Sequence, residues 1–201
     1  MQKSSVARDG YEATTSQKLA REIMGANFFG VEEAVKHFGV KPTKQQLAKL
    51  AEIPFTADVL RECKDTHVLV AVFPLSVLDM VKMDSSLFSL LTHRWCGREE
   101  FAKEKGALGW QLVRKTHVRD STWKGWEEQQ ALLGKDEEVP SAQVMVFTII
   151  GHYKNTGERL FENVYVRCSC VDSGGYRVYV GDFDSDGLNV FYYRLLLLLG
   201  R

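Results

Sequence analysis

The stretch of residues 143–193, QVMVFTIIGHYKNTGERLFENVYVRCSCVDSGGYRVYVGDFDSDGLNVFYY, decides the predicted fold because apolar runs alternate in it with short turn signals. The apolar runs cover residues 143–153, 159–171, 176–183 and 188–193. Each gap between them contains a glycine, which tolerates the positive φ angles of tight turns. Links this short favour neighbouring antiparallel strands, so the stretch predicts a β-meander.

The region before this meander adds one more strand and a long excursion. The residues around Trp110 and Leu112 predict a strand, and residues 119–138 form a polar, tryptophan-containing interruption of the sheet. Residues 144–150 are apolar on both faces, which is typical of a central strand covered by helices on one side. The predicted fold class is α+β: a helical N-terminal part packed on a C-terminal antiparallel β-meander of about five strands.

The N-terminal half is dominated by helix signals. Residues 31–38 place apolar side chains at helical spacing, and Thr43 with Gln46 forms a capping-box pattern that opens a helix over residues 44–51. Thr56 is expected to cap a short helix that runs to Cys63. The other expected elements are a buried strand at residues 67–73, a helix at 75–81 and an exposed helix at 98–105.

These elements predict a flexible N-terminus at residues 1–15, a helical segment at 16–66 and an α+β sheet domain at 67–201. A chain of 201 residues with 45% hydrophobic content can bury one core, so the last two parts are expected to form one compact unit.

The balance of charges gives no reason to expect a partner that is attracted by the net charge of the protein. Lys+Arg and Asp+Glu both number 26, so neither nucleic acid nor an anionic membrane is expected as a general partner. No stretch approaches the roughly 20 apolar residues that span a bilayer, and no membrane partner is predicted. The start of the chain resembles no leader segment, and the four cysteines form no C-x-x-C pair, which predicts a cytoplasmic location.

Four stretches carry a resemblance to known sequences. They are residues 28–34 (FFGVEEA), 51–56 (AEIPFT), 110–115 (WQLVRK) and 165–169 (YVRCS). Through them the chain resembles a family of uncharacterised bacterial hypothetical proteins over about residues 16–193. The resemblance implies a bacterial cytoplasmic protein and brings no activity, cofactor or site residue. The chain departs from that family after Tyr193, where Arg194 and five leucines follow.

The most suggestive metal motif is the acidic turn that contains Asp182, Asp184 and Asp186. Three carboxylates at alternate positions before Gly187 can wrap a calcium ion. The twelve-residue loop fails at its last position, however, because Tyr193 stands where a bidentate glutamate is required. An acidic hairpin turn explains the same residues and is the preferred interpretation, so no metal is predicted.

The cysteines and histidines offer weaker hypotheses. Cys168 and Cys170 are two apart in a predicted strand and share one face, where cysteine as a small core residue is favoured over metal ligation. His93 and Cys96 combine a base with a nucleophile and give the hypothesis of a small enzyme. No P-loop, G-x-G-x-x-G or G-x-S-x-G occurs in the sequence, and neither a cofactor nor a catalytic residue is assigned.

Two surfaces are candidates for binding. Residues 31–51 have the pattern of a helix-turn-helix with lysines available for phosphates, which gives the hypothesis of a DNA-associated regulator. Trp123 and Trp126 stand in the polar excursion, where large aromatic side chains serve either as a partner-binding surface or as a cap on the sheet edge. The leading expectation is a non-catalytic cytoplasmic binding protein that meets another protein through Trp123 and Trp126.

Overall fold

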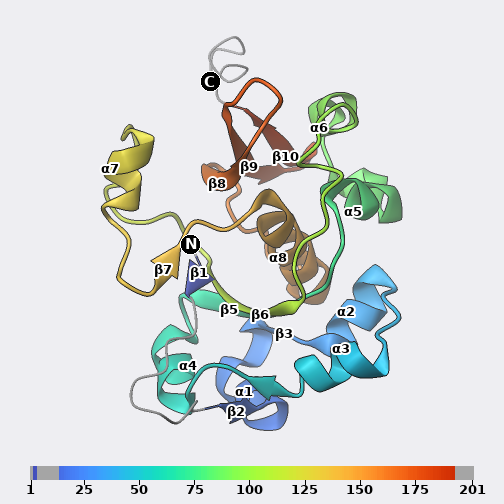
Figure 1. Cartoon of the computed structure of the whole chain (residues 1–201), viewed down its shortest axis with the longest axis vertical. Helices are drawn as coiled ribbons and strands as arrows, with labels where there is room; N and C mark the ends of the chain where they lie inside the picture. Colours follow the sequence, from blue (N-terminus) through green and yellow to red (C-terminus); the bar gives the residue numbers. More distant parts are fainter. Residues whose placement is uncertain (1, 4–13, 193–201) are drawn as a thin grey trace.

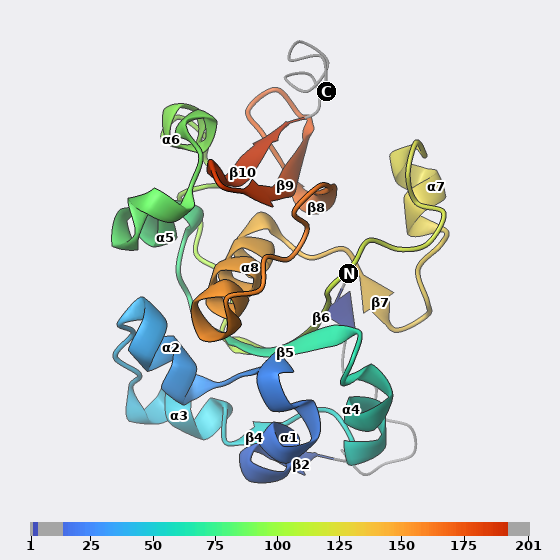
Figure 2. The same cartoon turned by 180° about the vertical axis from the view of Figure 1, so that it is seen from behind.

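The computed structural model describes residues 2–3 and 14–192, which form a five-stranded and a three-stranded β-sheet separated by one central helix, together with a small sheet of two strands, β2 and β4 (Figures 1 and 2). The helices are α1 Gln17–Met24, α2 Val31–Phe38, α3 Lys44–Lys49, α4 Ala57–Cys63, α5 Val77–Met83, α6 Leu90–Cys96, α7 Trp126–Gln130 and α8 Ala142–Thr156. The strands are β1 Gln2–Lys3, β2 Thr15–Ser16, β3 Phe28–Phe29, β4 Glu52–Ile53, β5 His67–Val72, β6 Gly109–Arg114, β7 Glu137–Glu138, β8 Tyr165–Val171, β9 Arg177–Asp184 and β10 Gly187–Tyr192.

The central helix is α8, and it replaces the strand expected at residues 143–153, so that prediction is wrong. Every residue from Ala142 to His152 is buried, because a sheet covers α8 on each side. A helix buried all round is apolar all round, and its sequence therefore loses the period that distinguishes a surface helix from a buried strand. Ser141 caps the N-terminus by accepting from the Val144 amide at 3.3 Å, and Gly157 ends the helix at a φ of 78°.

The meander has three strands rather than about five, in the order β10-β9-β8, and both pairings are antiparallel as expected. The strand at Trp110 does not belong to it. That strand, β6, pairs along its whole length with β5, from His67 opposite Arg114 to Val72 opposite Gly109. The α+β class is confirmed, with the antiparallel sheet at the C-terminal end.

The second sheet has five strands in the order β3-β5-β6-β1-β7, and only the pairing of β3 with β5 is parallel. The strand expected at residues 67–73 is found as β5, all of whose residues are buried. Gln2–Lys3 pairs with both β6 and β7, and Thr15 is buried in β2, so these parts of the expected flexible N-terminus belong to sheets. The rest of that segment and the Leu195–Leu199 run lie outside the described residues.

The N-terminal helices are found close to where they are expected, but they do not pack on the meander. α1 and α4 contact each other beside the five-stranded sheet, and α2 contacts α8 (Figure 1). Thr43 and Thr56 cap α3 and α4 as predicted, by accepting from the amides of Gln46 and Val59. The helix expected at 98–105 is wrong: the segment forms turns, and its Phe101 and Ala102 are buried in the core.

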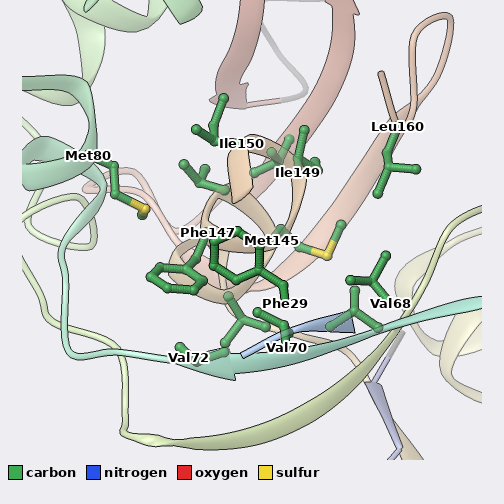
Figure 3. Packing of buried hydrophobic residues seen from close by; sticks show 14 of the residues in the cluster. Phe29, Val68, Val70, Val72, Met80, Met145, Phe147, Ile149, Ile150 and Leu160 are labelled. Carbon is green, nitrogen blue, oxygen red and sulfur yellow. The ribbon is translucent and has the colours of Figure 1, made fainter. Parts of the chain in front are cut away.

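The main hydrophobic core runs continuously from the N-terminal helices to β10. Figure 3 shows Met145 and Phe147 of α8 beside Val68, Val70 and Val72 of β5. The Phe147 ring also stacks on Phe38 of α2, with 4.4 Å between the ring centroids. No helix among the described residues is long and apolar enough to cross a membrane.

Candidate functional site

The segment between β6 and α8, residues 115–138, forms an arm that projects from the two-sheet body in both views (Figures 1 and 2). Hydrogen bonds within the arm define its shape. The Gln129 side-chain amide donates to the Ser121 carbonyl oxygen at 2.6 Å, and the Glu128 carboxylate accepts from the Gly125 amide at 2.7 Å. The arm returns to the body through β7, which pairs with β1, so both of its ends are held by the five-stranded sheet.

Trp123 is the most exposed large hydrophobic residue that the structure describes, with a relative accessibility of 101%. Its φ angle is 61°, a left-handed conformation that bulky side chains rarely adopt. Asp120, three residues earlier, has a φ angle of 60°. The arm therefore combines unusual backbone geometry with a tryptophan ring that is fully in solvent.

Trp126, in contrast, connects the arm to the C-terminal sheet. The Arg177 guanidinium of β9 lies over the Trp126 ring, with 3.8 Å from Cζ to the ring centroid. Arg177 also donates a hydrogen bond to the Ser169 carbonyl oxygen of β8, which fixes the guanidinium position. The two tryptophans expected to form one surface thus have separate environments: Trp126 covers the end of the β8–β9 pair, and Trp123 is left exposed.

The acidic turn uses its carboxylates in hydrogen bonds with the protein. Asp182 accepts from the Tyr165 hydroxyl at 2.6 Å, and Asp184 accepts from the Asp186 amide at 2.8 Å across the β9–β10 turn. Among residues 2–3 and 14–192, no group of three or more His, Cys, Asp or Glu side chains could hold a metal ion. The geometry is that of an acidic hairpin turn, and it gives no support to a calcium site.

The four cysteines form no disulfide bond, and the two on β8 lie against the core. Cys168 is fully buried, and burial raises the pKa of its thiol well above the ordinary value. Cys170 is half-buried, and burial raises the pKa of its thiol as well. Cysteine as a small core residue is the interpretation that these surroundings favour.

His93 and Cys96 both lie on α6, but their hydrogen bonds point to other partners. His93 Nε2 lies 2.9 Å from the Ser85 carbonyl oxygen, whereas the Cys96 thiol is fully buried and faces the Val190 carbonyl oxygen at 3.9 Å. Burial raises the pKa of the Cys96 thiol to about 12, so the nucleophilic thiolate is absent at neutral pH. This arrangement gives no support to a Cys-His enzyme.

The segment expected to form a helix-turn-helix does form two helices, α2 and α3. α3 has six residues, which is about 9 Å of helix, too short to run along a major groove. Gln46, a polar side chain of α3, is used within the chain, because it accepts from the Thr43 amide at 2.9 Å in the capping box. The lysines of the pair face solvent.

One polar cluster escaped the sequence analysis. The Glu158 carboxylate contacts both Lys115 Nζ, at 2.8 Å, and His152 Nε2, at 2.7 Å, beside the C-terminal end of α8. Burial lowers the pKa of His152 despite the carboxylate beside it. Burial alone would raise the pKa of Glu158, but hydrogen bonds from Lys115 and His152 lower it. His152 and Glu158 are six residues apart, but Lys115 stands 43 residues before Glu158, and no short motif could have revealed the cluster.

No family model matches the chain, and neither the curated proteins nor the solved structures contain a significant match. The resemblance to uncharacterised bacterial proteins therefore stays a prediction. The function must be argued from the geometry of the arm and of the surfaces around it.

Proposed function

We propose that the chain is a non-catalytic cytoplasmic binding protein that contacts another protein through Trp123. The observation that carries this proposal is the complete exposure of Trp123 in a left-handed backbone conformation. A buried tryptophan side chain removes about 200 Å² from water, which contributes on the order of 5 kcal/mol before the costs of association. Tryptophan is accordingly enriched among the residues that dominate binding energy.

The backbone at Trp123 supports the same proposal. A left-handed conformation costs a non-glycine residue about 1–2 kcal/mol. A fully exposed ring makes no packing contacts with the described residues that offset this cost. Strain of this kind tends to occur at functional sites. A partner that buries the ring would supply the missing contacts.

The arm also holds the Trp123 ring in a restricted position, because the arm is attached to the sheets on both sides of this residue. β7 pairs with β1, and Trp126 lies on Arg177, so Trp123 is held between two attachments to the sheets. Preorganised presentation lowers the entropy that binding must overcome. The exposed Val171 lies opposite Arg177 across the β8–β9 pair and adds apolar surface beside this attachment. The cytoplasmic location is supported by the four cysteines, which form no disulfide bond and suit a reducing compartment.

The test replaces Trp123 with the photo-reactive residue p-benzoylphenylalanine and identifies cross-linked proteins in cells. The matched control carries the same residue at Leu90 on α6, which is 63% exposed and lies across the molecule from α7 (Figure 1). We expect one protein to be captured from position 123 and not from position 90. That protein, once purified, is expected to bind the Trp123→Ala variant at least about 30-fold more weakly, as for an interface hot spot. Equal affinity for the two chains, or equal capture at both positions, would overturn the proposal.

A further inference from the structure

The α2–α3 pair carries a second candidate surface, separate from the arm. The pair is held to the core where each of its helices ends. Phe38 at the end of α2 stacks on Phe147, and the Leu50 carbonyl oxygen after α3 accepts from Trp110 Nε1 at 3.0 Å and from Gln17 Nε2 at 2.9 Å. Gly39 makes the turn between the helices with a φ of 61°. The pair is therefore a projection anchored at the end of each helix, and its lysines face solvent.

After Glu33, every charged residue of this projection is a lysine. Between residues 34 and 51 the chain has four lysines and neither aspartate nor glutamate, although the whole chain has no net charge. The four lysines, all exposed, are Lys36, Lys41, Lys44 and Lys49. None of them lies within 4.0 Å of a carboxylate among the described residues.

The acidic residues nearest to these lysines in the chain are Glu32 and Glu33 on one side and the exposed Glu52 on the other, and none of the three forms an ion pair with them. Glu32 and Glu33, at the start of α2, both pair with Arg21 of α1, at 3.0 and 2.5 Å. An ordinary solvated surface intersperses charges of both signs, which keeps the local potential low. Four lysines without carboxylate partners on a fixed projection instead produce a positive potential that attracts polyanions.

We propose that the α2–α3 surface binds the phosphate backbone of a nucleic-acid duplex without reading its sequence. Lysine suits this task because its ammonium acts as a point charge toward phosphate oxygens. Base readout is not part of the proposal, since α3 spans less than two turns and its Gln46 is held by the capping box. Val35 and Leu47, also exposed on this pair, are expected to contribute nothing to phosphate binding.

The test measures fluorescence anisotropy of a labelled duplex DNA, and of the RNA duplex of the same sequence, titrated with the full chain over a series of salt concentrations. Each phosphate neutralised contributes about 0.9 to the slope of log affinity against log salt, so four lysines predict a slope of about −3.6. A fourfold rise in salt is then expected to weaken binding on the order of 100-fold. A slope near zero, or undetectable binding at low salt to both duplexes, would overturn the proposal.

Two variants with the same change in net charge separate the surface from the charge of the whole protein. The first changes Lys36, Lys41, Lys44 and Lys49 to glutamine, and the second changes four exposed lysines elsewhere, Lys64, Lys82, Lys105 and Lys135. We expect the first variant to lose the salt-dependent binding and the second to keep it, with unchanged circular dichroism in both. Equal losses in the two variants would contradict the proposal.

Two further measurements distinguish a surface that binds nucleic acid from one that binds an acidic protein. Poly-glutamate at equal charge concentration is expected to compete less strongly than unlabelled duplex, because a duplex carries about one charge per 1.7 Å and an extended peptide only about one per 3.5 Å. The double variant Val35→Ser/Leu47→Ser is expected to bind the duplex as the natural chain does. Strong competition by poly-glutamate, or loss of duplex binding in the double variant, would assign the surface to an acidic protein partner instead.

Discussion

The Trp126 ring and the Arg177 guanidinium are in direct contact, with 3.8 Å between Cζ and the ring centroid, and this contact joins the arm to the C-terminal sheet. It separates two tryptophans that are only three positions apart. Trp126 stabilises the attachment of the arm, whereas Trp123 contributes no packing to the folded chain. The two side chains should therefore respond oppositely to substitution.

Trp123→Gly is expected to leave the free energy of unfolding unchanged or to raise it by up to about 1 kcal/mol, because glycine adopts a φ of 61° without strain. Trp126→Gly is expected to lower it by about 1 kcal/mol and to expose residues 115–138 to limited proteolysis, because the contact with Arg177 is lost. Urea unfolding and timed trypsin digestion measure both effects. A larger stability loss in Trp123→Gly than in Trp126→Gly would contradict this division of roles.

Thr92→Val is expected to destabilise the protein by about 2 kcal/mol, because a buried amide loses its partner. The Thr92 hydroxyl donates to the Leu188 carbonyl oxygen at 3.0 Å and accepts from the Val190 amide at 2.9 Å, along the open edge of β10. The matched control is Thr148→Val in α8, where the equally buried hydroxyl donates only to the Val144 carbonyl oxygen of its own helix. That control is expected to cost less than about 1 kcal/mol by urea unfolding. Equal losses of unfolding free energy in the two variants would show that the hydrogen bonds between Thr92 and β10 add nothing beyond those of an ordinary buried threonine.

Gly181→Ala is expected to cost more than about 3 kcal/mol or to prevent folding. A Cβ atom at this position would meet the Val164 carbonyl oxygen at 2.1 Å, where β9 passes β8, and the φ angle is +147°. Gly157→Ala is the control, since its φ is +78° but nothing lies within 4 Å of the added atom. The control should lose only about 1 kcal/mol of unfolding free energy, because backbone strain acts there without a collision. Similar losses in both would remove the steric explanation.

Stability is expected to fall as the pH drops below about 6.5, the ordinary pKa of histidine. Burial lowers the pKa of His152 and of His37 in the folded chain, so the unfolded chain binds protons first and acid favours unfolding. The lowered pKa of Glu158 acts in the same direction at lower pH, since its contribution is lost only when the carboxylate becomes protonated. His152→Gln is expected to flatten the loss of stability between neutral and mildly acidic pH, measured by urea unfolding at each pH. The exposed His117→Gln should leave the slope unchanged, and an unchanged slope in His152→Gln would refute the assignment.

The sequence was sufficient wherever neighbouring residues decide the structure. The helix caps at Thr43 and Thr56, the buried strand at residues 67–72 and the acidic turn between β9 and β10 are local, and all were predicted. The strand predicted at residues 143–153 was wrong because this run is apolar on all sides. It is apolar on all sides because a sheet covers it on each side, and the short sequence does not show those sheets. Its length, with Ser141 before it and Gly157 after it, is a signal for a helix that the interpretation did not use.

The candidate site was predictable only in part, for the same reason. The long excursion with Trp123 and Trp126 was identified as a binding candidate, but the contact between Trp126 and Arg177 joins residues of different elements. The pairing of β6 with β5 is likewise non-local, since Leu69 lies opposite Leu112. Side-chain exposure and long-range pairing arise only after the chain has folded, so composition and spacing could not distinguish the anchored tryptophan from the exposed one.

The place of α8 between the two sheets has a consequence for how the chain can be divided. Each sheet loses its inner covering if this helix is removed, so neither half contains a complete hydrophobic interior. A fragment cut before residue 142 would expose the inner face of β5, and one starting after residue 157 would expose that of β9. Truncated halves should therefore aggregate when expressed separately, and any split of the gene that preserves folding must keep this one helix with both of its neighbours.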